Sequence, residues 1–194
     1  MQVQQSLYTP EQYLKLEEQA ESKSEYRNGE IFPMTGGTTN HNTLALNMAL
    51  FLKLALKGQP YKIFMNDLRL WIDRDRIYTY PDVMVIRDRP MYHGEGTAIV
   101  TNPLAIFEVL SKSTRNYDLG EKFGYYRTLD SLQEYILIEQ SRYQVLQYVK
   151  VDKTWVLTEY ETPSDILHFQ SIPCKISLSE LYEEVDFCIG EIGT

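Results

Sequence analysis

The sequence has no long apolar run, no basic leader and few cysteines, and each absence excludes a class of protein. No stretch approaches the roughly 20 apolar residues of a membrane-spanning helix, so we expect no contact with a membrane. The first residues, MQVQQSLYTPEQ, contain neither the basic nor the apolar segment of a signal peptide. Cys174 and Cys188 lack metal-site spacing and are predicted to be free thiols in a reducing cytoplasm; a disulfide between them is the open alternative.

An excess of positive charge is also missing, because 27 acidic residues outnumber 19 Lys and Arg and give a net charge of −8. A module that only coats nucleic acid should be basic, since phosphate neutralisation supplies most of its affinity. The charge therefore argues against a passive DNA-binding module. It argues less against a metal-dependent nuclease, because clustered carboxylates that bind cations make the net charge of the protein more negative.

The length of 194 residues suits one domain with one core, which we expect to span residues 1–194. Helices are predicted at residues 9–21, 39–57, 114–129 and 177–185. Asn28-Gly29 predicts a hairpin between two short strands. Further strands are predicted at residues 61–66, 68–72, 77–86 (interrupted by Pro81), 104–110, 134–139, 142–150 and 153–160, and a polar loop at 87–103. This order predicts an α/β or α+β domain with a mixed sheet flanked by helices, and with additional β-hairpins.

Two acids lie inside apolar, strand-like segments: Asp82 in TYPDVMVI and Glu108 in AIFEVL. Burying a lone carboxylate costs several kcal/mol or forces its protonation, so each acid needs a partner. A shared divalent cation would satisfy both, and carboxylate oxygens suit Mg²⁺ or Mn²⁺. The sequence therefore predicts a metal site that contains Asp82 and Glu108.

The segment STRNYDLGEKFGYY predicts a helix after the Glu108 strand, with Ser113 or Thr114 at its N-cap. Asp118 and Lys122 are spaced i and i+4 and so share one face of this helix, where Asp118 is placed to position Lys122. Because the connection to the strand is short, we expect the helix to pack back over it. Lys122 would then lie near the carboxylates, where it would orient or help deprotonate the attacking water and stabilise developing negative charge.

Five segments match, in order, a known family: SEYRNGEI, MTGGTTNHN, YPDVMVI, FEVLSKSTRNYDLGEKFGYYR and EYILIE. With them the chain resembles the Uma2 family of restriction-endonuclease-like proteins, also called DUF820, within the PD-(D/E)XK nuclease superfamily. The resemblance covers about residues 8–185. It implies a restriction-endonuclease-like core within the α/β class, and a Mg²⁺-dependent endonuclease that hydrolyses phosphodiester bonds in DNA.

The resemblance also implies site residues. Asp82, Glu108 and a lysine would form the catalytic core, and the backbone carbonyl of Val109 would be a further metal ligand. Glu25 matches an acid that often completes such sites. His41 matches the Asn-His-Asn element at the start of the long helix, where it would contact substrate or pin the loop.

One position departs from the superfamily motif. The motif lysine two residues after the acid is replaced here by Leu110, in Glu108-Val109-Leu110. In Uma2-like sequences the lysine lies on the following helix, at the place that Lys122 occupies. Lys112 is closer in sequence, but it ends the strand and is expected to face solvent.

Each candidate also has an ordinary structural explanation. Asp82 follows a proline and would be a turn-forming acid. Glu108 would form a buried ion pair with an arginine, and Lys122 a surface pair with the acid one helical turn before it. The position of Glu25 is equally compatible with an exposed acid on the hairpin. A single histidine near the start of a helix, such as His41, more often has a structural role.

Three candidate functions are compatible with the sequence. The first is the DNA endonuclease. The second is a nuclease-fold binding or assembly module with little catalysis, which the acidic balance and the missing motif lysine favour. The third is a metal-dependent hydrolase of a small phosphate ester. We also expect a homodimer, because the strand-rich second half leaves edge strands that need cover, and a C₂ pair would offer two sites for two DNA strands.

Overall fold

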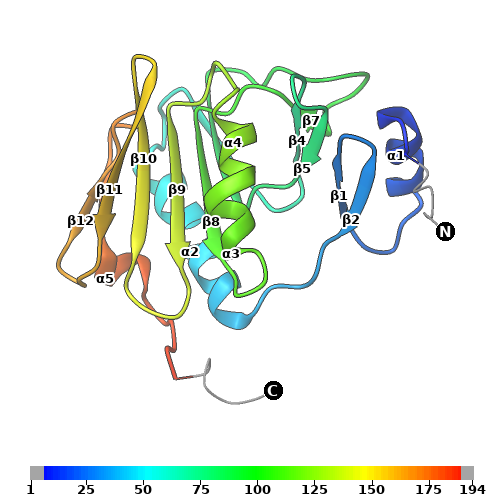
Figure 1. Cartoon of the computed structure of the whole chain (residues 1–194). Helices are drawn as coiled ribbons and strands as arrows, with labels where there is room; N and C mark the ends of the chain where they lie inside the picture. The colour runs from blue at the N-terminus through cyan, green and yellow to red at the C-terminus, as the bar shows by residue number, and fades with distance from the viewer. Residues whose placement is uncertain (1–6, 189–194) are drawn as a thin grey trace.

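The computed structural model of the protein describes residues 7–188 (Figure 1). A six-stranded mixed sheet forms its centre, in the order β11-β10-β9-β8-β6-β3. Only the β8–β9 pair of this sheet is parallel. Its strands are β3 (Tyr61–Met65), β6 (Val83–Arg87), β8 (Ala105–Leu110), β9 (Glu134–Glu139), β10 (Val145–Val151) and β11 (Thr154–Tyr160).

A second, five-stranded sheet lies beside the first, in the order β2-β1-β5-β4-β7, and a small two-stranded sheet pairs β12 with β13. The five strands are β1 (Ser24–Arg27), β2 (Glu30–Pro33), β4 (Arg69–Ile72), β5 (Ile77–Thr79) and β7 (Ile99–Val100). The small sheet consists of β12 (Ile166–His168) and β13 (Lys175–Ser177).

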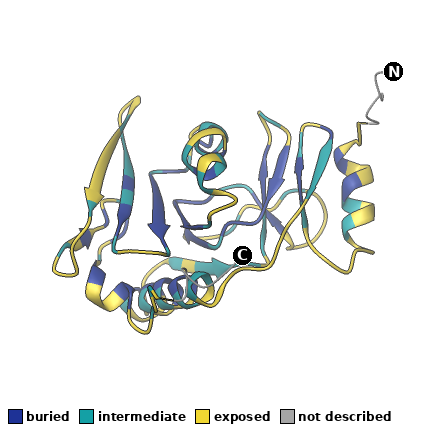
Figure 2. Ribbon diagram, turned by 60° about the horizontal axis from the view of Figure 1, so that its bottom comes forward, coloured by how far each residue is buried: buried dark blue, intermediate teal, exposed yellow. Residues whose placement is uncertain are grey.

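Helices cover both faces of the central sheet (Figures 1 and 2). One face packs against α2 and α5, and the other against a continuous segment made of α3, the π-helical turn η1 and α4. The bounds are α1 (Pro10–Glu17), α2 (Thr39–Ala55), α3 (Arg115–Tyr117), η1 (Asp118–Lys122), α4 (Phe123–Tyr126) and α5 (Leu178–Leu181). Within residues 7–188, no helix combines the length and apolar character needed to cross a membrane. The predicted α/β class, with a mixed sheet flanked by helices, is confirmed.

The central strand β8 explains how a carboxylate comes to lie between sheet and helix. All six of its residues are buried, as the apolar run AIFEVL predicts. Successive side chains of a strand point to opposite faces, so Phe107 and Val109 pack on the α2 side. Glu108 therefore points to the other face, toward the segment α3–η1–α4.

The predicted interruption of the run at residues 77–86 by Pro81 is confirmed, and Pro81 divides this run into two strands of different sheets. β5 pairs with β1 and β4 in the five-stranded sheet, whereas β6 pairs with β3 and β8 in the central one. Proline cannot donate to a sheet ladder, and the chain leaves one sheet and enters the other on either side of it. Asp82 thus lies at the junction of the two sheets, directly before β6.

Local sequence signals account for several elements. Asn28 and Gly29 have positive φ angles of 45° and 106°, which confirms the predicted hairpin turn between β1 and β2. Thr9 and Gln12 form the reciprocal capping hydrogen bonds of α1. The hairpin of β10 and β11 and the short helix α5 are also confirmed.

Four details differ from the predictions. Strand β7 lies within the predicted polar loop at residues 87–103, and the β12–β13 pair was not predicted. The predicted helix at 114–129 covers residues 115–126 and contains a π-helical turn. Thr114 occupies its N-cap position but makes no capping hydrogen bond; instead the Ser111 hydroxyl accepts from the backbone N–H of Thr114.

Candidate functional site

Asp82, Glu108 and Lys122 line one cavity of about 940 Å³. Its walls are the β1–β2 hairpin, the loop and first turn of α2, and the segment that follows β8. The structure therefore brings together three residues from three separate elements. Val109, Glu25, His41 and Asp118 line the same cavity, so every predicted site residue lies there.

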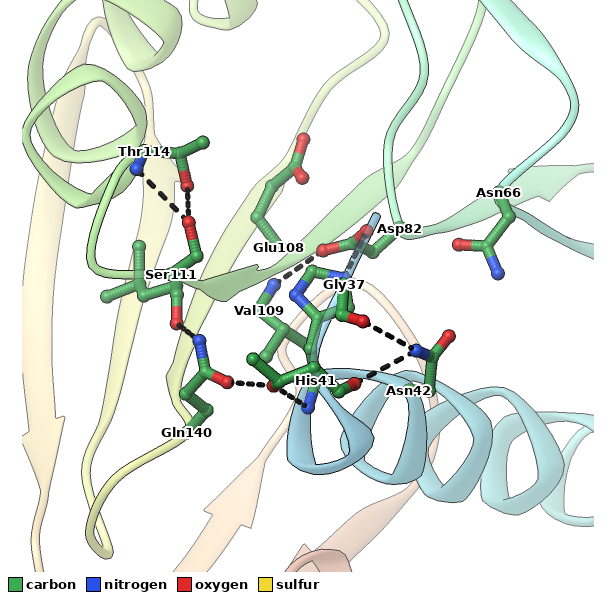
Figure 3. A network of polar contacts seen from close by, with 12 residues as sticks. Gly37, His41, Asn42, Asn66, Asp82, Glu108, Val109, Ser111, Thr114 and Gln140 are labelled. Carbon is green, nitrogen blue, oxygen red and sulfur yellow. Dashed lines mark hydrogen bonds and ion pairs between the residues drawn. The ribbon is translucent and has the colours of Figure 1, made fainter. Parts of the chain in front are cut away.

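The Asp82 carboxylate is held on both sides (Figure 3). Its Oδ1 lies 3.0 Å from Nε2 of His41, and its Oδ2 accepts a hydrogen bond of 2.8 Å from the backbone N–H of Val109. The β6–β8 pairing ends at Val83, which leaves this stretch of β8 open to the aspartate. Asp82 is thereby fixed by two elements other than its own, which a turn-forming acid would not need.

His41 is positioned by the start of α2. Thr38 is the N-cap residue, and its side chain accepts from the backbone N–H of His41 at 3.1 Å. A Cβ atom at Gly37 would lie 2.9 Å from Cδ2 of the ring, so only glycine leaves room for the ring there. Burial lowers the pKa of His41, but the hydrogen bond and charge of Asp82 outweigh burial and raise it overall.

Glu108 is buried, and one of its oxygens is shared by two donors. Oε1 accepts a 2.7 Å hydrogen bond from the Tyr126 hydroxyl and lies 2.8 Å from Nζ of Lys122. Oε2 accepts no hydrogen bond from any residue between 7 and 188. Burial raises the pKa of Glu108 to about 8, although the Lys122 charge acts in the opposite direction. A buried carboxylate with one open oxygen is thus directed into the cavity.

Lys122 is the centre of a buried charge cluster. Its Nζ lies 2.8 Å from Glu108, 3.3 Å from Asp118 and 3.8 Å from Glu25, and its side chain is 8% exposed. Burial alone would lower the pKa of Lys122, but the surrounding carboxylates, Glu108 foremost, raise it well above its ordinary value. The prediction that the helix packs back over the Glu108 strand is confirmed, and the alternative of a surface pair is wrong.

The turn that carries Lys122 is itself unusual. η1 is π-helical, a conformation that occurs mostly as single turns inserted in α-helices and often at functional sites. The Tyr135 hydroxyl, from β9, donates to the backbone carbonyl of Asp118 at 3.1 Å. The widened turn is therefore anchored to the sheet from below, and it directs both Asp118 and Lys122 inward.

Glu25 is also buried, at 5% exposure, so the exposed hairpin acid is excluded. It accepts from the Thr79 hydroxyl, and its other oxygen is paired with Arg27 at 2.6 Å. Burial raises the pKa of Glu25, but Lys122, Thr79 and Arg27 together lower it. Glu25 is thus held in the charged form on the hairpin side of Lys122.

Tyr126 and Arg27 contribute to the site but were not predicted. Tyr126 continues the i, i+4 spacing of Asp118 and Lys122, so helical periodicity alone places it on their face. Arg27 lies two residues after Glu25 on β1, hence on the same side of the strand. Its guanidinium lies between two rings, 4.2 Å from the centroid of Phe32 and 3.7 Å from that of Tyr117, which no local pattern indicates.

The residues fit a hard divalent cation by the chemistry of their donors. Among residues 7–188, no three His, Cys, Asp or Glu side chains are grouped so as to hold a metal on their own. Mg²⁺ is usually bound by one or two carboxylates and keeps other oxygen ligands, which Asp82 and the open oxygen of Glu108 can supply. The N–H and C=O of a strand residue point to the same side, so the Val109 carbonyl faces the same open edge as the N–H that binds Asp82.

Charges around the cavity are separated by depth. Its acids, Glu25, Asp82, Glu108, Asp118 and Glu139, are all buried or half-buried. Lys112 and Arg142 are exposed, and Arg27 and Arg115 are half-buried. The exposure of Lys112 confirms the expectation for that residue. Apart from Lys122, the cations that line the cavity are thus half-buried or exposed, whereas its acids are buried or half-buried.

Comparison with known proteins identifies the family of the chain. The Uma2 family, described as "Putative restriction endonuclease", matches residues 10–180. The chain is 47% identical over 154 residues to the "Uncharacterized protein sll1609" of Synechocystis sp., across 79% of this chain and 87% of that protein. It is 34% identical over 183 residues to a second Synechocystis protein, slr1290, across 92% and 93% of the two chains.

One solved structure shares the fold. It is described as a "putative nuclease belonging to DUF820" from Anabaena variabilis, and it aligns with a TM-score of 0.75 at 20% identity. The alignment covers 90% of this chain and 97% of that one. Together with the family match, this confirms the restriction-endonuclease-like fold. The chain belongs to the Uma2 (DUF820) family of restriction-endonuclease-like proteins.

Proposed function

We propose that this protein is a metal-dependent nuclease that hydrolyses phosphodiester bonds in DNA. The observation that supports it most is the convergence of Asp82, Glu108 and Lys122 on one cavity, from the residue directly before β6, from β8 and from η1. The family description and the name of the Anabaena neighbour point to the same activity. The free thiols of Cys174 and Cys188 suit our further proposal that the protein works in a reducing cytoplasm.

Asp82, Glu108 and the Val109 carbonyl would hold Mg²⁺ or Mn²⁺. When bound, such a cation supplies Lewis acidity to the scissile phosphate and acidity to the attacking water. His41 and the Val109 N–H keep the Asp82 carboxylate in one orientation. Tyr126 does the same for Glu108 through Oε1 and leaves Oε2 free.

Lys122 would act as a cation and hydrogen-bond donor. Its raised pKa keeps it protonated at neutral pH, which favours orienting the water over removing its proton. An ammonium group beside Glu108 also stabilises negative charge that develops on the phosphate. Asp118, 3.3 Å from Nζ, restrains the direction of this side chain.

A polyanionic substrate is favoured by the cations that line the cavity. Phosphate contacts from Lys and Arg supply much of the affinity of proteins for DNA. Lys112, Arg115 and Arg142 line the cavity and are exposed or half-buried, whereas its acids are buried or half-buried. A homodimer, which we include in the proposal, would offer two such sites to the two strands of a duplex.

One experiment separates the three candidate functions. Metal-stripped protein is incubated with supercoiled plasmid, with single-stranded RNA and with bis(4-nitrophenyl) phosphate, each with Mg²⁺, Mn²⁺ or EDTA. We expect nicking of the plasmid that requires a divalent cation. Turnover of the chromogenic diester without cleavage of nucleic acid would identify a small-phosphate hydrolase. The absence of all turnover, together with the absence of Mn²⁺ binding in calorimetry, would identify a binding module.

Gly37 offers a test of how His41 supports the metal site. In Gly37→Ala the new Cβ forces the His41 ring away from Asp82, since it would lie 2.9 Å from the ring. Partners that orient metal ligands typically contribute 10- to 100-fold to metal affinity, so we expect Mn²⁺ affinity to fall by roughly tenfold or more. Isothermal titration calorimetry measures this directly.

Gly36→Ala is the matched control for Gly37→Ala. It lies in the same loop, and a Cβ atom there meets nothing within 4 Å. We expect its Mn²⁺ affinity to equal that of the wild type. An equal loss of Mn²⁺ affinity in both variants would mean that the flexibility of the loop, and not the position of the His41 ring, determines the affinity of the metal site.

Cation affinity should increase with pH. The pKa of Glu108 is raised to about 8, so below that pH the folded, metal-free protein binds a proton that a cation must displace. Displacing one proton makes affinity increase about tenfold per pH unit below the pKa, and we expect this slope for Mn²⁺ between about pH 6 and pH 8, with a plateau above. Calorimetry in buffers of different ionisation enthalpy should show proton release near pH 7, and a pH-independent affinity would contradict the role of Glu108.

A further inference from the structure

Strand β11 forms an open edge of the central sheet. It is the last strand in the order β11-β10-β9-β8-β6-β3, and among residues 7–188 only β10 pairs with it. Figure 2 shows it as an exposed strand, in yellow, at the margin of the molecule. Val156 and Leu157 are 50% and 49% exposed. An exposed apolar edge strand is a template for pairing with another strand.

The backbone groups available at this edge can be assigned. Residues opposite one another in an antiparallel pair alternate between hydrogen-bonded and non-hydrogen-bonded. Lys150 lies opposite Trp155, and its N–H donates to Gln133, toward β9 and away from β11. Lys150 and Trp155 are therefore a non-hydrogen-bonded pair. By alternation, Trp155, Leu157 and Glu159 turn their N–H and C=O groups to the open edge.

This set of free groups is symmetric about Leu157. If a second β11 runs antiparallel with Leu157 opposite Leu157 of the partner subunit, Trp155 faces Glu159 of the partner subunit. All three positions then meet as hydrogen-bonded pairs, as the alternation requires. Leu157 sits beside Tyr148 of β10, so the two exposed leucines complete an apolar row across the joined sheets.

The charges that flank the strand are complementary in the same register. Lys153, in the β10–β11 turn, and Glu161, directly after β11, are both exposed. Each lies four residues from Leu157, on opposite sides. Pairing about Leu157 therefore sets Lys153 against Glu161 of the partner subunit, twice in each dimer. A parallel arrangement would instead set like charges together.

We propose that two copies of this chain dimerise by antiparallel pairing of β11 about a twofold axis at Leu157, joining their central sheets into one. This specifies the surface and register of the dimer in the proposed function, and it does not depend on catalysis. β11 is separated from β8 by β10 and β9, so the pairing leaves the Asp82–Glu108 cavity uncovered.

A charge exchange tests both the surface and the register. Lys153→Glu and Glu161→Lys each replace two attractive contacts per dimer with two repulsive ones, and we expect each to raise the dimer dissociation constant roughly tenfold. The double variant Lys153→Glu/Glu161→Lys restores opposite charges and should return the constant to near the wild-type value. Sedimentation equilibrium over a range of protein concentrations measures all four proteins, with circular dichroism to verify folding.

Leu50→Lys on α2 is the matched control. Leu50 is another exposed apolar residue, at 53%, but it lies on α2 and not on β11, so its replacement should leave the dissociation constant unchanged. A monomeric wild type, no rescue by the double variant, or sensitivity of the dimer to Leu50→Lys in place of the β11 changes would each overturn the proposal. The rate of plasmid nicking per subunit should be unchanged in the β11 variants. The dissociation constant therefore tests the interface, and the nicking rate tests the nuclease proposal independently.

Discussion

Asp82→Asn and Glu108→Gln are each expected to reduce cation-dependent plasmid cleavage by roughly 10³-fold. A correctly bound metal contributes several kcal/mol of transition-state stabilisation, and each 1.36 kcal/mol corresponds to a factor of ten in rate. Both changes keep the size of the side chain but replace an anionic oxygen with an amide. Initial rates of nicking, measured with saturating Mg²⁺ and with Mn²⁺, give the effect, and calorimetry gives the accompanying loss of Mn²⁺ affinity.

Glu139→Gln is the matched control for these two variants. Glu139 is also a buried acid that lines the cavity, but it is paired with Arg115 and with Ser141. Its replacement removes one negative charge without removing a proposed ligand, so it should keep cleavage within a few-fold of the wild type. If all three variants lose activity equally, the negative potential of the cavity matters and the assignment of Asp82 and Glu108 as ligands is wrong. Cleavage that survives in the double variant Asp82→Asn/Glu108→Gln would contradict the proposed function itself.

Burial logic explains why Asp82 and Glu108 could be predicted from the sequence. A carboxylate inside an apolar strand has few ways to remain in a folded protein, so its position alone indicates a partner. Lys122 required one further step, since a short connection returns the helix to the strand that precedes it. The helical spacing then placed Asp118 and Lys122 on one face, and would equally have placed Tyr126 there.

Other parts of the site depend on contacts that local sequence does not encode. Pro81 indicated an irregular strand, but the choice of two sheets follows from the pairing of β5 with β1, some 50 residues earlier. The π-helical turn is bonded to Tyr135 of β9 and has no sequence signal of its own. Arg27 is held between Phe32 and Tyr117, of which the second lies about 90 residues away in the chain. Long-range packing, and not propensity, decides such features.

Lys122→Met should have the largest effect on stability. Lys122 is the cation that three buried carboxylates share, those of Glu25, Glu108 and Asp118. Removing one partner of a buried ion pair typically costs 3–5 kcal/mol, because the remaining charge is left uncompensated, and we expect a loss of about this size in the free energy of unfolding. Urea denaturation of the metal-free protein measures it as a lower midpoint with an unchanged slope.

The double variant Lys122→Met/Glu108→Gln distinguishes lost charge compensation from lost packing. Neutralising Glu108 removes the nearest of the carboxylates that have lost their cation. The double variant should therefore be more stable than Lys122→Met alone, whereas additive effects would make it less stable.

The pH dependence of stability provides a second readout with a defined sign. The folded pKa of Glu108 is raised, so its contribution to stability is fully present below its unfolded pKa and is lost as pH rises through about 8. Without Lys122, which acts to lower that pKa, stability should continue to fall above about pH 8, where that of the wild type levels off. A deficit that stays constant on both sides of about pH 8 would instead indicate a packing role for the lysine stem.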